Sequence, residues 1–202
     1  MKELLLATRN RDKVREIARI LGDLPVRLRT PDEFPGVPEV EEDGETFEEN
    51  AAKKALTVAM HSGLLSLADD TGLVVPSLGG EPGVRSSRYA GEGVSYEDNW
   101  RKLLARMAGL PDAERGACFI CVAVLADPGG VVGSAEGRCE GTILREPRGE
   151  GGFGYDPVFL HAPSGKTFAE LTIEEKNLVS HRAAAMRRIK GMLEARIAEA
   201  LS

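Results

Sequence analysis

The strongest candidate for chemistry in this sequence is the pair of adjacent carboxylates Asp69-Asp70. Apolar residues lie on both sides of it, in Leu64–Ala68 and Leu73–Val75, so we expect two buried strands with the pair in the turn between them. Buried carboxylates are costly to desolvate unless a cation meets them, and hard divalent ions bind carboxylate oxygens. A metal site therefore explains the pair. A polar turn explains it equally well, because Asp, Thr and Gly are common turn residues.

A second candidate is the polar segment Thr8–Lys13, which follows the predicted strand Glu3–Ala7. The residues after it have the apolar spacing of one helix face as far as Leu21, and Gly22 is placed to end that helix. A helix that starts after a strand presents backbone N–H groups and a positive dipole end, which together bind phosphate. The segment lacks the glycines of a Walker A loop, and an ordinary polar turn is the other interpretation.

The elements that must position these residues can be predicted from apolar spacing and from capping residues. We expect a helix from Thr46 to about His61, with a capping box of Thr46 and Glu49, and a helix from Ser95 to Met107. Thr172 and Glu175 form another capping box, and Ser180 can cap the final helix. The expected strands are Val26–Arg29, Ala117–Ala126, Val131–Cys139 and Gly141–Arg145.

Composition limits the class of protein. The chain has 202 residues, which suits one domain. A net charge of −6 argues against a general nucleic-acid or membrane-surface binder, and the longest apolar run, Ala117–Ala126, is too short to span a membrane. The first residues have no long apolar stretch typical of a secretion signal, so we expect a cytoplasmic location. Three cysteines are an odd number, which argues against a disulfide framework, and the C-x-x-C of Cys118 and Cys121 falls in a predicted core strand.

Taken together, five segments resemble the inosine triphosphate pyrophosphatase family, the dITP/XTP pyrophosphatases. They are ATRNRDK (Ala7–Lys13), TFEENAAKKA (Thr46–Ala55), ADDTGL with GGEPGVRSSRYAG (Ala68–Gly91), GGFGYDPVF (Gly151–Phe159) and TFAELTIEEKNLVSHR (Thr167–Arg182). The resemblance implies an α/β fold, in which an elongated mixed sheet flanked by helices forms two lobes of a single domain, residues 1–202, with a central substrate cleft. It also implies a homodimer.

The activity implied by the resemblance is hydrolysis of a purine nucleoside triphosphate with a 6-oxo group, such as ITP, dITP or XTP. The products are the monophosphate and pyrophosphate, and Mg²⁺ is the expected cofactor. The preference among the three substrates, the number of metal ions and the dimer interface stay open. A Maf-like pyrophosphatase acting on pyrimidine or other modified nucleotides is the main alternative, and a nucleotide-binding module without turnover is a second.

The same resemblance assigns roles to particular residues. It places the metal at Glu41, Asp69 and Asp70, with Asp70 also the general base, although which aspartate is ligand and which is base stays open. Lys53, which could instead pair with Glu49, is expected to reach the phosphates. The full set of expected substrate-binding residues is Thr8, Arg9, Asn10, Arg11, Asp12, Lys13, Lys53, Thr71, Phe153, Gly154, Tyr155, Asp156, Lys176, His181 and Arg182, with Phe153 stacked on the purine.

Overall fold

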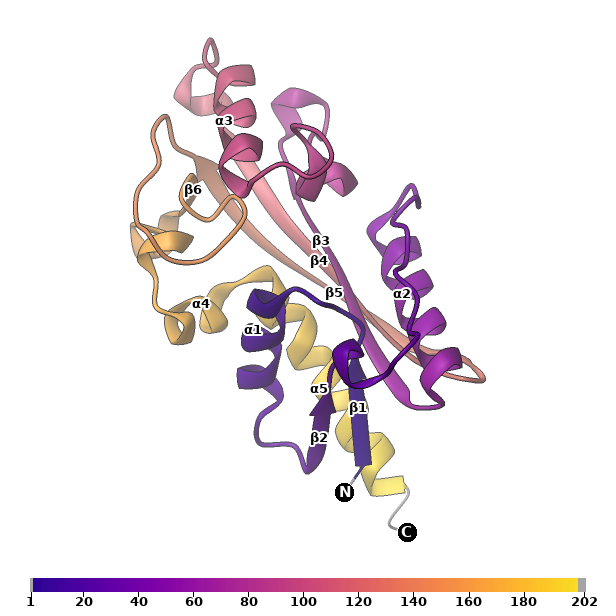
Figure 1. The fold of residues 1–202 in the computed structure, drawn as a ribbon. Coiled ribbons are helices and arrows are strands. Elements are labelled where there is room, and N and C mark those ends of the chain that lie inside the picture. The colour runs from indigo at the N-terminus through magenta and orange to yellow at the C-terminus, as the bar shows by residue number, and fades with distance from the viewer. Residues whose placement is uncertain (1, 200–202) are drawn as a thin grey trace. The chain divides into compact units, whose positions relative to one another are not determined.

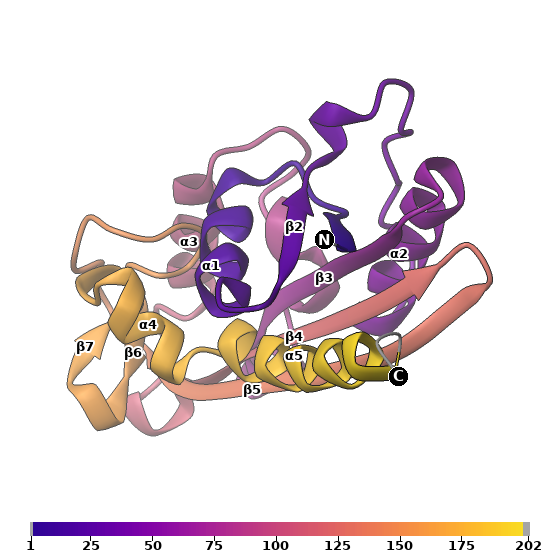
Figure 2. The same cartoon turned by 90° about the horizontal axis from the view of Figure 1, so that it is seen from below.

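The structure is a computed structural model that describes residues 2–199. Its strands form one seven-stranded sheet in the order β2-β1-β3-β4-β5-β6-β7, with β1 to β6 labelled in Figure 1 and β7 in Figure 2. Strand β1 pairs in parallel with β2 and β3, whereas β6 pairs antiparallel with β5 and β7, so the sheet is mixed, as the resemblance implied. The strands are β1 (Lys2–Leu6), β2 (Val26–Arg29), β3 (Leu65–Val74), β4 (Gly116–Asp127), β5 (Gly130–Ile143), β6 (Phe159–His161) and β7 (Lys166–Thr167).

The helices start where capping residues stand in the sequence. Thr46 and Glu49 form the predicted capping box of α2, Ser95 caps α3 with Asp98, and Thr172 caps α4 with Glu175. The α-helices are α1 (Arg11–Leu21), α2 (Phe47–Ser62), α3 (Tyr96–Arg106), α4 (Ile173–Val179) and α5 (His181–Glu199). Short 3₁₀ helices lie at Pro31–Glu33, Pro76–Leu78, Gly83–Arg88, Asp112–Glu114, Ala162–Ser164 and Phe168–Glu170.

The chain divides into two compact units. The described residues of unit 1 are 2–70, 121–137 and 182–199, and those of unit 2 are 71–120 and 138–181. Strands β3, β4 and β5 each begin in one unit and end in the other, because the boundaries at Asp70, Ile120 and Gly137 fall inside them. Each unit has its own apolar core.

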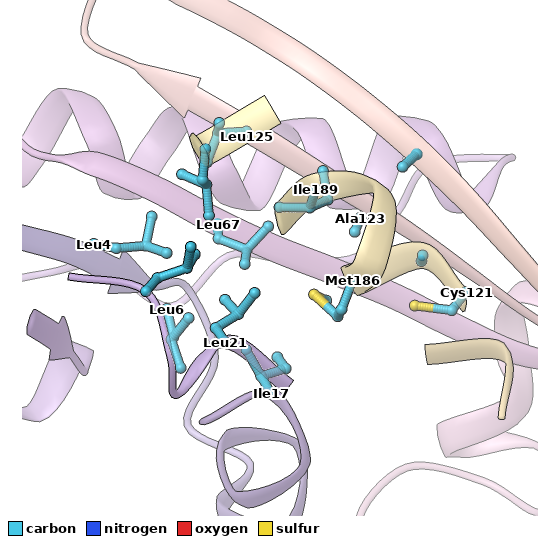
Figure 3. Close-up of a cluster of buried hydrophobic side chains, with 14 residues drawn as sticks. Leu4, Leu6, Ile17, Leu21, Leu67, Cys121, Ala123, Leu125, Met186 and Ile189 are labelled. Atoms are coloured by element: carbon cyan, nitrogen blue, oxygen red, sulfur yellow. The ribbon is translucent and has the colours of Figure 1, made fainter. Parts of the chain in front are cut away.

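The core of unit 1 lies between its strands and the helices α1 and α5, and α5 runs along β4 and β5 (Figure 2). Leu4 and Leu6 of β1 and Leu67 of β3 meet Ile17 of α1 and Met186 of α5 (Figure 3). All five side chains are at most 1% exposed. This packing fixes which face of β3 meets α1 and α5.

One sequence prediction about the central stretch is wrong. Asp69 and Asp70 do not lie in a turn between two strands but in the middle of the continuous strand β3. Successive side chains of a strand point to opposite faces. Leu67 and Asp69 therefore share the face covered by α1 and α5, while Asp70 points to the other face, where α2 lies.

The core of unit 2 is rich in aromatic rings. Phe119 of β4 lies 4.6 Å from Phe159 and 5.8 Å from Phe168, measured between ring centroids, and the Phe119 and Phe168 rings are stacked. Leu103 and Met107 of the α3 region complete this core.

One further strand prediction is wrong, and two strands were not predicted. Gly141–Arg145 is not a separate strand, because β5 continues without a break to Ile143, and the short strands β6 and β7 had no counterpart among the predictions. The three cysteines are buried, and none of them forms a disulfide bond within the described residues 2–199. Within residues 2–199 no helix is long and apolar enough to cross a membrane.

Candidate functional site

Asp70 is the centre of a polar cluster on the α2 side of β3. Its Oδ2 accepts a hydrogen bond from the Asn50 side-chain amide at 3.1 Å, and its Oδ1 lies 3.7 Å from the Lys54 ammonium. Lys54 also pairs with the Glu42 carboxylate and donates to the Asp69 carbonyl at 2.8 Å. Two carboxylates thus share one ammonium group, and Asp70 and Lys54 are both buried.

The electrostatics of this cluster suit a general base. Burial raises the pKa of Asp70, and the negative charge of Glu42 raises it further, so the pKa stays above its ordinary value in spite of Lys54, Lys13 and the Asn50 amide. For Lys54, burial lowers the pKa, but the charges of Asp70, Glu42 and Asp69 outweigh burial and raise it. Lys54 is therefore a fixed positive charge beside a carboxylate whose pKa has moved toward the range useful for proton transfer.

Asp69 makes a different set of contacts on the opposite face of β3. Its Oδ2 accepts hydrogen bonds from Arg182 Nη2 at 3.0 Å and Nε at 3.3 Å, and lies 3.1 Å from the Lys13 ammonium. Arg182 Nη1 in turn donates to Glu16 Oε2 at 2.6 Å. Arg182 is 1% exposed, and the charges of Asp69 and Glu16 raise its pKa although burial opposes them. The Asp69 carboxylate is therefore committed to two cations of the protein.

These contacts bear on two expectations. The carboxylates of Asp69 and Asp70 point to opposite faces of the strand, so they do not form one cluster. The Arg182 guanidinium lies between Glu16 and Asp69 in unit 1, and its expected role at the purine stays a prediction. The guanidinium has these partners because β3 and α5 pack together, and an arginine buried there needs carboxylates.

The polar segment Thr8–Lys13 forms the entry to α1. Asn10 is the N-cap, and its Oδ1 accepts from the backbone N–H groups of Asp12 and Lys13, while Thr8 Oγ1 accepts from Asn10 N. The helix start predicted to bind phosphate therefore has two of its N–H groups already capped by a side chain. Lys13 adds its ammonium group beside Asp69, at the inner end of this segment.

The other charged side chains of this segment make contacts at the surface. The Arg9 guanidinium donates to Asp32 at 3.2 Å and to the Val37 carbonyl at 3.1 Å, Asp12 pairs with Arg15, and Arg11 is exposed. Of the charged residues in Thr8–Lys13, Lys13 is the one that the structure places beside the buried carboxylates.

Lys53 and Glu41 both lie at the surface. The Lys53 ammonium pairs with Asp43 at 2.6 Å, and both side chains are largely in solvent. Glu41 is exposed, whereas its neighbour Glu42 reaches Lys54. The adjacent residues Lys54 and Glu42 are the ones that pair near Asp70, because one step along the chain turns a side chain to another face. The expected roles of Lys53 and Glu41 toward phosphate and metal stay predictions.

Unit 2 brings together part of the predicted purine group. Asp156 Oδ2 accepts from the Lys176 ammonium at 2.5 Å and from the backbone N–H of Phe153 at 2.9 Å. The same ammonium lies 4.8 Å from the centroid of the Phe153 ring, a cation–π contact. Gly152 permits this turn, since its φ is +70° and a Cβ there would lie 2.1 Å from Asp156 Oδ2. Phe153 is half-buried, while Asp156 and Lys176 are buried.

The remaining predicted residues of unit 2 lie near this group or in the core. The His181 ring stacks on Phe119 with centroids 4.5 Å apart, and the Tyr155 hydroxyl donates to the Ser86 carbonyl at 2.9 Å. Both side chains are buried, and burial raises the pKa of Tyr155. Gly154 has a positive φ of 64°, and Thr71 is half-buried in β3. His181 and Tyr155 thus belong to the packing that supports the Phe153 loop.

A divalent metal was expected at Glu41, Asp69 and Asp70, and the structure does not assemble these three ligands. Across residues 2–199, no three His, Cys, Asp or Glu side chains are grouped so that they could hold an ion. Two carboxylates, those of Asp70 and Glu42, do lie beside the Lys54 ammonium. Mg²⁺ is commonly held by one or two carboxylates while substrate phosphates and water supply the other oxygens. The donors present fit a Mg²⁺ ion that arrives with a phosphate ligand.

Four residues of these clusters were missed by the sequence analysis: Glu16, Glu42, Asn50 and Lys54. The sequence does contain a pattern that could have identified two of them, Asn50 and Lys54. Asn50 and Lys54 are one turn apart and share the face of α2 that carries the buried Ala51, Ala55 and Val58. Polar residues within an apolar helical stripe are rarely buried without a partner, so their position on that face indicates a partner in the sheet.

Comparison with known proteins shows the relationship directly. The model of the Ham1 family matches residues 4–192. A dITP/XTP pyrophosphatase of Geobacter sulfurreducens is 52% identical over 193 residues, which cover 96% of this chain and 97% of that protein. One of Syntrophobacter fumaroxidans is 54% identical over 183 residues, covering 91% of this chain and 78% of that protein.

Solved structures agree with the sequence relatives. A HAM1 protein from Coxiella burnetii superimposes with a TM-score of 0.88 at 40% identity, covering 96% of this chain and all of that one. The Ham1 protein of Staphylococcus aureus gives a TM-score of 0.85 at 37% identity, with coverage of 96% and 100%. With its fold, its motifs and these relatives in agreement, the chain belongs to the Ham1 family.

Proposed function

We propose that this protein hydrolyses non-canonical purine nucleoside triphosphates, such as ITP, dITP and XTP, to the monophosphate and pyrophosphate. The observation that carries the proposal is the buried Asp70 carboxylate, held between the Asn50 amide and the Lys54 ammonium. The names of the curated relatives, dITP/XTP pyrophosphatase, supply the substrate class and favour it over a Maf-like activity on pyrimidine nucleotides. Such an activity removes deaminated purines from the nucleotide pool.

The proposed reaction begins with a water molecule beside Asp70. Its oxygen forms a bond to a phosphorus atom of the triphosphate, its proton passes to the Asp70 carboxylate, and the bridging P–O bond to pyrophosphate breaks. Phosphoryl transfer depends on positioning and on stabilising negative charge. The fixed charge of Lys54 lies beside the base, and the ammonium of Lys13 lies beside Asp69. Both cations can oppose the charge that develops on phosphate oxygens.

Mg²⁺ is part of the proposal, with Asp70 and Glu42 as the residues that would hold it. When bound, the ion would neutralise phosphate charge and orient the phosphate oxygens. A tetra-anionic substrate would itself favour a binding region with Lys13 and Lys54, in spite of the net charge of −6.

In unit 2, we propose that the half-buried Phe153 ring stacks on the purine. The Lys176 ammonium, fixed by Asp156 beside that ring, offers a hydrogen-bond donor to a 6-oxo group. Adenine presents an amine donor at the same position, so the two donors would oppose one another. Sites built around such a hydrogen bond discriminate by roughly 10⁴-fold, whereas shape alone gives about 10²-fold.

The test is the rate of pyrophosphate release from ITP, XTP, GTP and ATP in the presence of Mg²⁺. We expect kcat/KM for ITP or XTP to exceed that for ATP by at least about 10²-fold, with GTP also poor because of its 2-amino group. Hydrolysis in ¹⁸O-water identifies the attacked phosphorus by labelling either the monophosphate or the pyrophosphate. Equal rates on ATP and ITP, or release of orthophosphate alone, would overturn the proposal. The homodimer implied by the family resemblance and the cytoplasmic location expected from the first residues of the sequence both stay predictions.

A further inference from the structure

Asn50 connects the loop 41–44 to the Asp70 carboxylate. Its Oδ1 accepts from the backbone N–H of Gly44 at 2.8 Å, and its Nδ2 donates to Asp70 Oδ2 at 3.1 Å. A backbone N–H can only donate, so the amide oxygen faces Gly44 and the amide NH₂ faces Asp70. The side chain is 1% exposed. The orientation of this buried amide is therefore fixed by its partners.

Gly44 permits the close approach on which this connection depends. A Cβ atom at Gly44 would lie 2.7 Å from Asn50 Oδ1 and 2.9 Å from the Glu49 Cβ. The loop that Asn50 holds in this way also carries Glu42, whose carboxylate pairs with Lys54. Asn50 and Lys54, one turn apart on α2, thus face the two oxygens of Asp70 separately, Asn50 at Oδ2 and Lys54 at Oδ1.

We propose that Asn50 is a positioning residue for the hydrolytic reaction, which fixes the rotation of the Asp70 carboxylate and locks the Glu42 loop against it. The terminal torsion of an aspartate is broad, so a carboxylate without such a partner samples many orientations. The Asn50 donor narrows this range and presents one lone pair of the base to water. This inference rests on the proposed function, in which Asp70 accepts the proton.

The first test is Asn50→Asp. This variant keeps the shape and the acceptor for Gly44 but turns an oxygen, in place of the NH₂ donor, toward Asp70. We expect kcat per folded molecule for ITP to fall on the order of 10- to 100-fold, the usual cost of losing a partner that orients a reactive group, with KM little changed. A purely structural role would lower the folded fraction, measured by circular dichroism, and leave kcat per folded molecule unchanged.

The chain offers a matched control in Asn99 of α3. Its buried amide makes the same kind of double contact, because Oδ1 accepts from Ala90 N at 2.7 Å and Nδ2 donates to the Ser87 carbonyl at 3.0 Å. No carboxylate is involved in these two bonds. Asn99→Asp should therefore lower the unfolding temperature but retain the wild-type kcat per folded molecule.

A double-mutant cycle with Asp70→Asn shows whether the effect of Asn50→Asp on kcat depends on the Asp70 carboxylate. The single variant Asp70→Asn should lose about 10²–10⁴-fold in kcat, and adding Asn50→Asp to it should cause no further loss. Gly44→Ala displaces the Asn50 amide without adding charge, and should lower kcat in the same direction as Asn50→Asp. If Asn50→Asp does not fold, Gly44→Ala alone tests the proposal.

Different outcomes test the positioning role of Asn50 and the proposed role of Asp70 as the base. Wild-type kcat per folded molecule in both Asn50→Asp and Gly44→Ala, or a fully additive loss in the double variant, would overturn the role of Asn50. An Asp70→Asn enzyme with wild-type kcat would instead overturn the assignment of Asp70 as base.

Discussion

Asp69 and Asp70 are neighbours in the chain, yet their carboxylates lie on opposite faces of strand β3 and serve different partners. Asp69 binds Arg182 and Lys13, whereas Asp70 meets Asn50 and Lys54. A pair that looks like one acidic site in the sequence is thus two sites in the structure. The division supports our proposal that Asp70, and not Asp69, acts as the base.

The first prediction contrasts the adjacent lysines of α2. Lys54→Met should lower kcat for ITP on the order of 10²-fold. It removes the cation that the proposed reaction places near the phosphate, and it takes from Asp70 and Glu42 the partner that they share. Lys53→Met removes a surface pair with Asp43, worth less than about 1 kcal/mol, and should leave kcat close to wild type. Steady-state pyrophosphate release measures both variants. A larger loss from Lys53→Met than from Lys54→Met would restore the original assignment.

The second prediction concerns the pH dependence of stability. The pKa of Asp70 is raised in the folded state, so the folded chain holds this proton more tightly than the unfolded chain. The corresponding stabilisation is complete below the unfolded pKa of about 3.9, and is lost as the pH rises through the higher folded pKa. Asp70→Asn should therefore become more stable relative to wild type across that window. The measurement is the urea unfolding midpoint of both proteins at a series of pH values without Mg²⁺. The prediction is contradicted if the stability of the wild type rises relative to that of Asp70→Asn as the pH increases.

A third prediction tests the buried network of Arg182. Arg182→Met removes the guanidinium from two buried carboxylates, Glu16 and Asp69, of which Asp69 keeps Lys13, and should lower the free energy of unfolding by about 3–5 kcal/mol. Lys190→Met, also in α5, removes a pair with the exposed Asp23 and should cost less than about 1 kcal/mol. Urea denaturation compares the two directly. Equal, small losses would mean that the Arg182 network does not stabilise the fold.

The fourth prediction concerns Phe153. Removing a ring on which a base stacks costs about 1–3 kcal/mol, so Phe153→Ala should raise KM for ITP strongly. The affinity for inorganic triphosphate, which has no base, serves as the internal control and should change little. If KM for ITP is unaltered, the purine binds elsewhere.

Local signals in the sequence determined most of the secondary structure and the family. The capping boxes at Thr46, Ser95 and Thr172 mark helix starts because they act within one turn, and the apolar runs of β1, β2 and β4 identify strands without reference to distant residues. Five ordered motifs were sufficient to indicate the family, since each carries its information in adjacent residues. The group of Phe153, Asp156 and Lys176 could likewise be predicted as one cluster, and the structure brings these three together.

Only the tertiary structure decided which neighbour in each charged pair faces the site. Whether Lys53 or Lys54, Glu41 or Glu42, and Asp69 or Asp70 meets a given partner depends on which face of its element packs inward. Adjacent residues differ by about 100° on a helix and by about 180° on a strand, so a shift of one position exchanges a buried ion pair for a solvated one. The contact between Asp69 and Arg182 joins residues 113 positions apart, and it exists because helix α5 packs against strand β3.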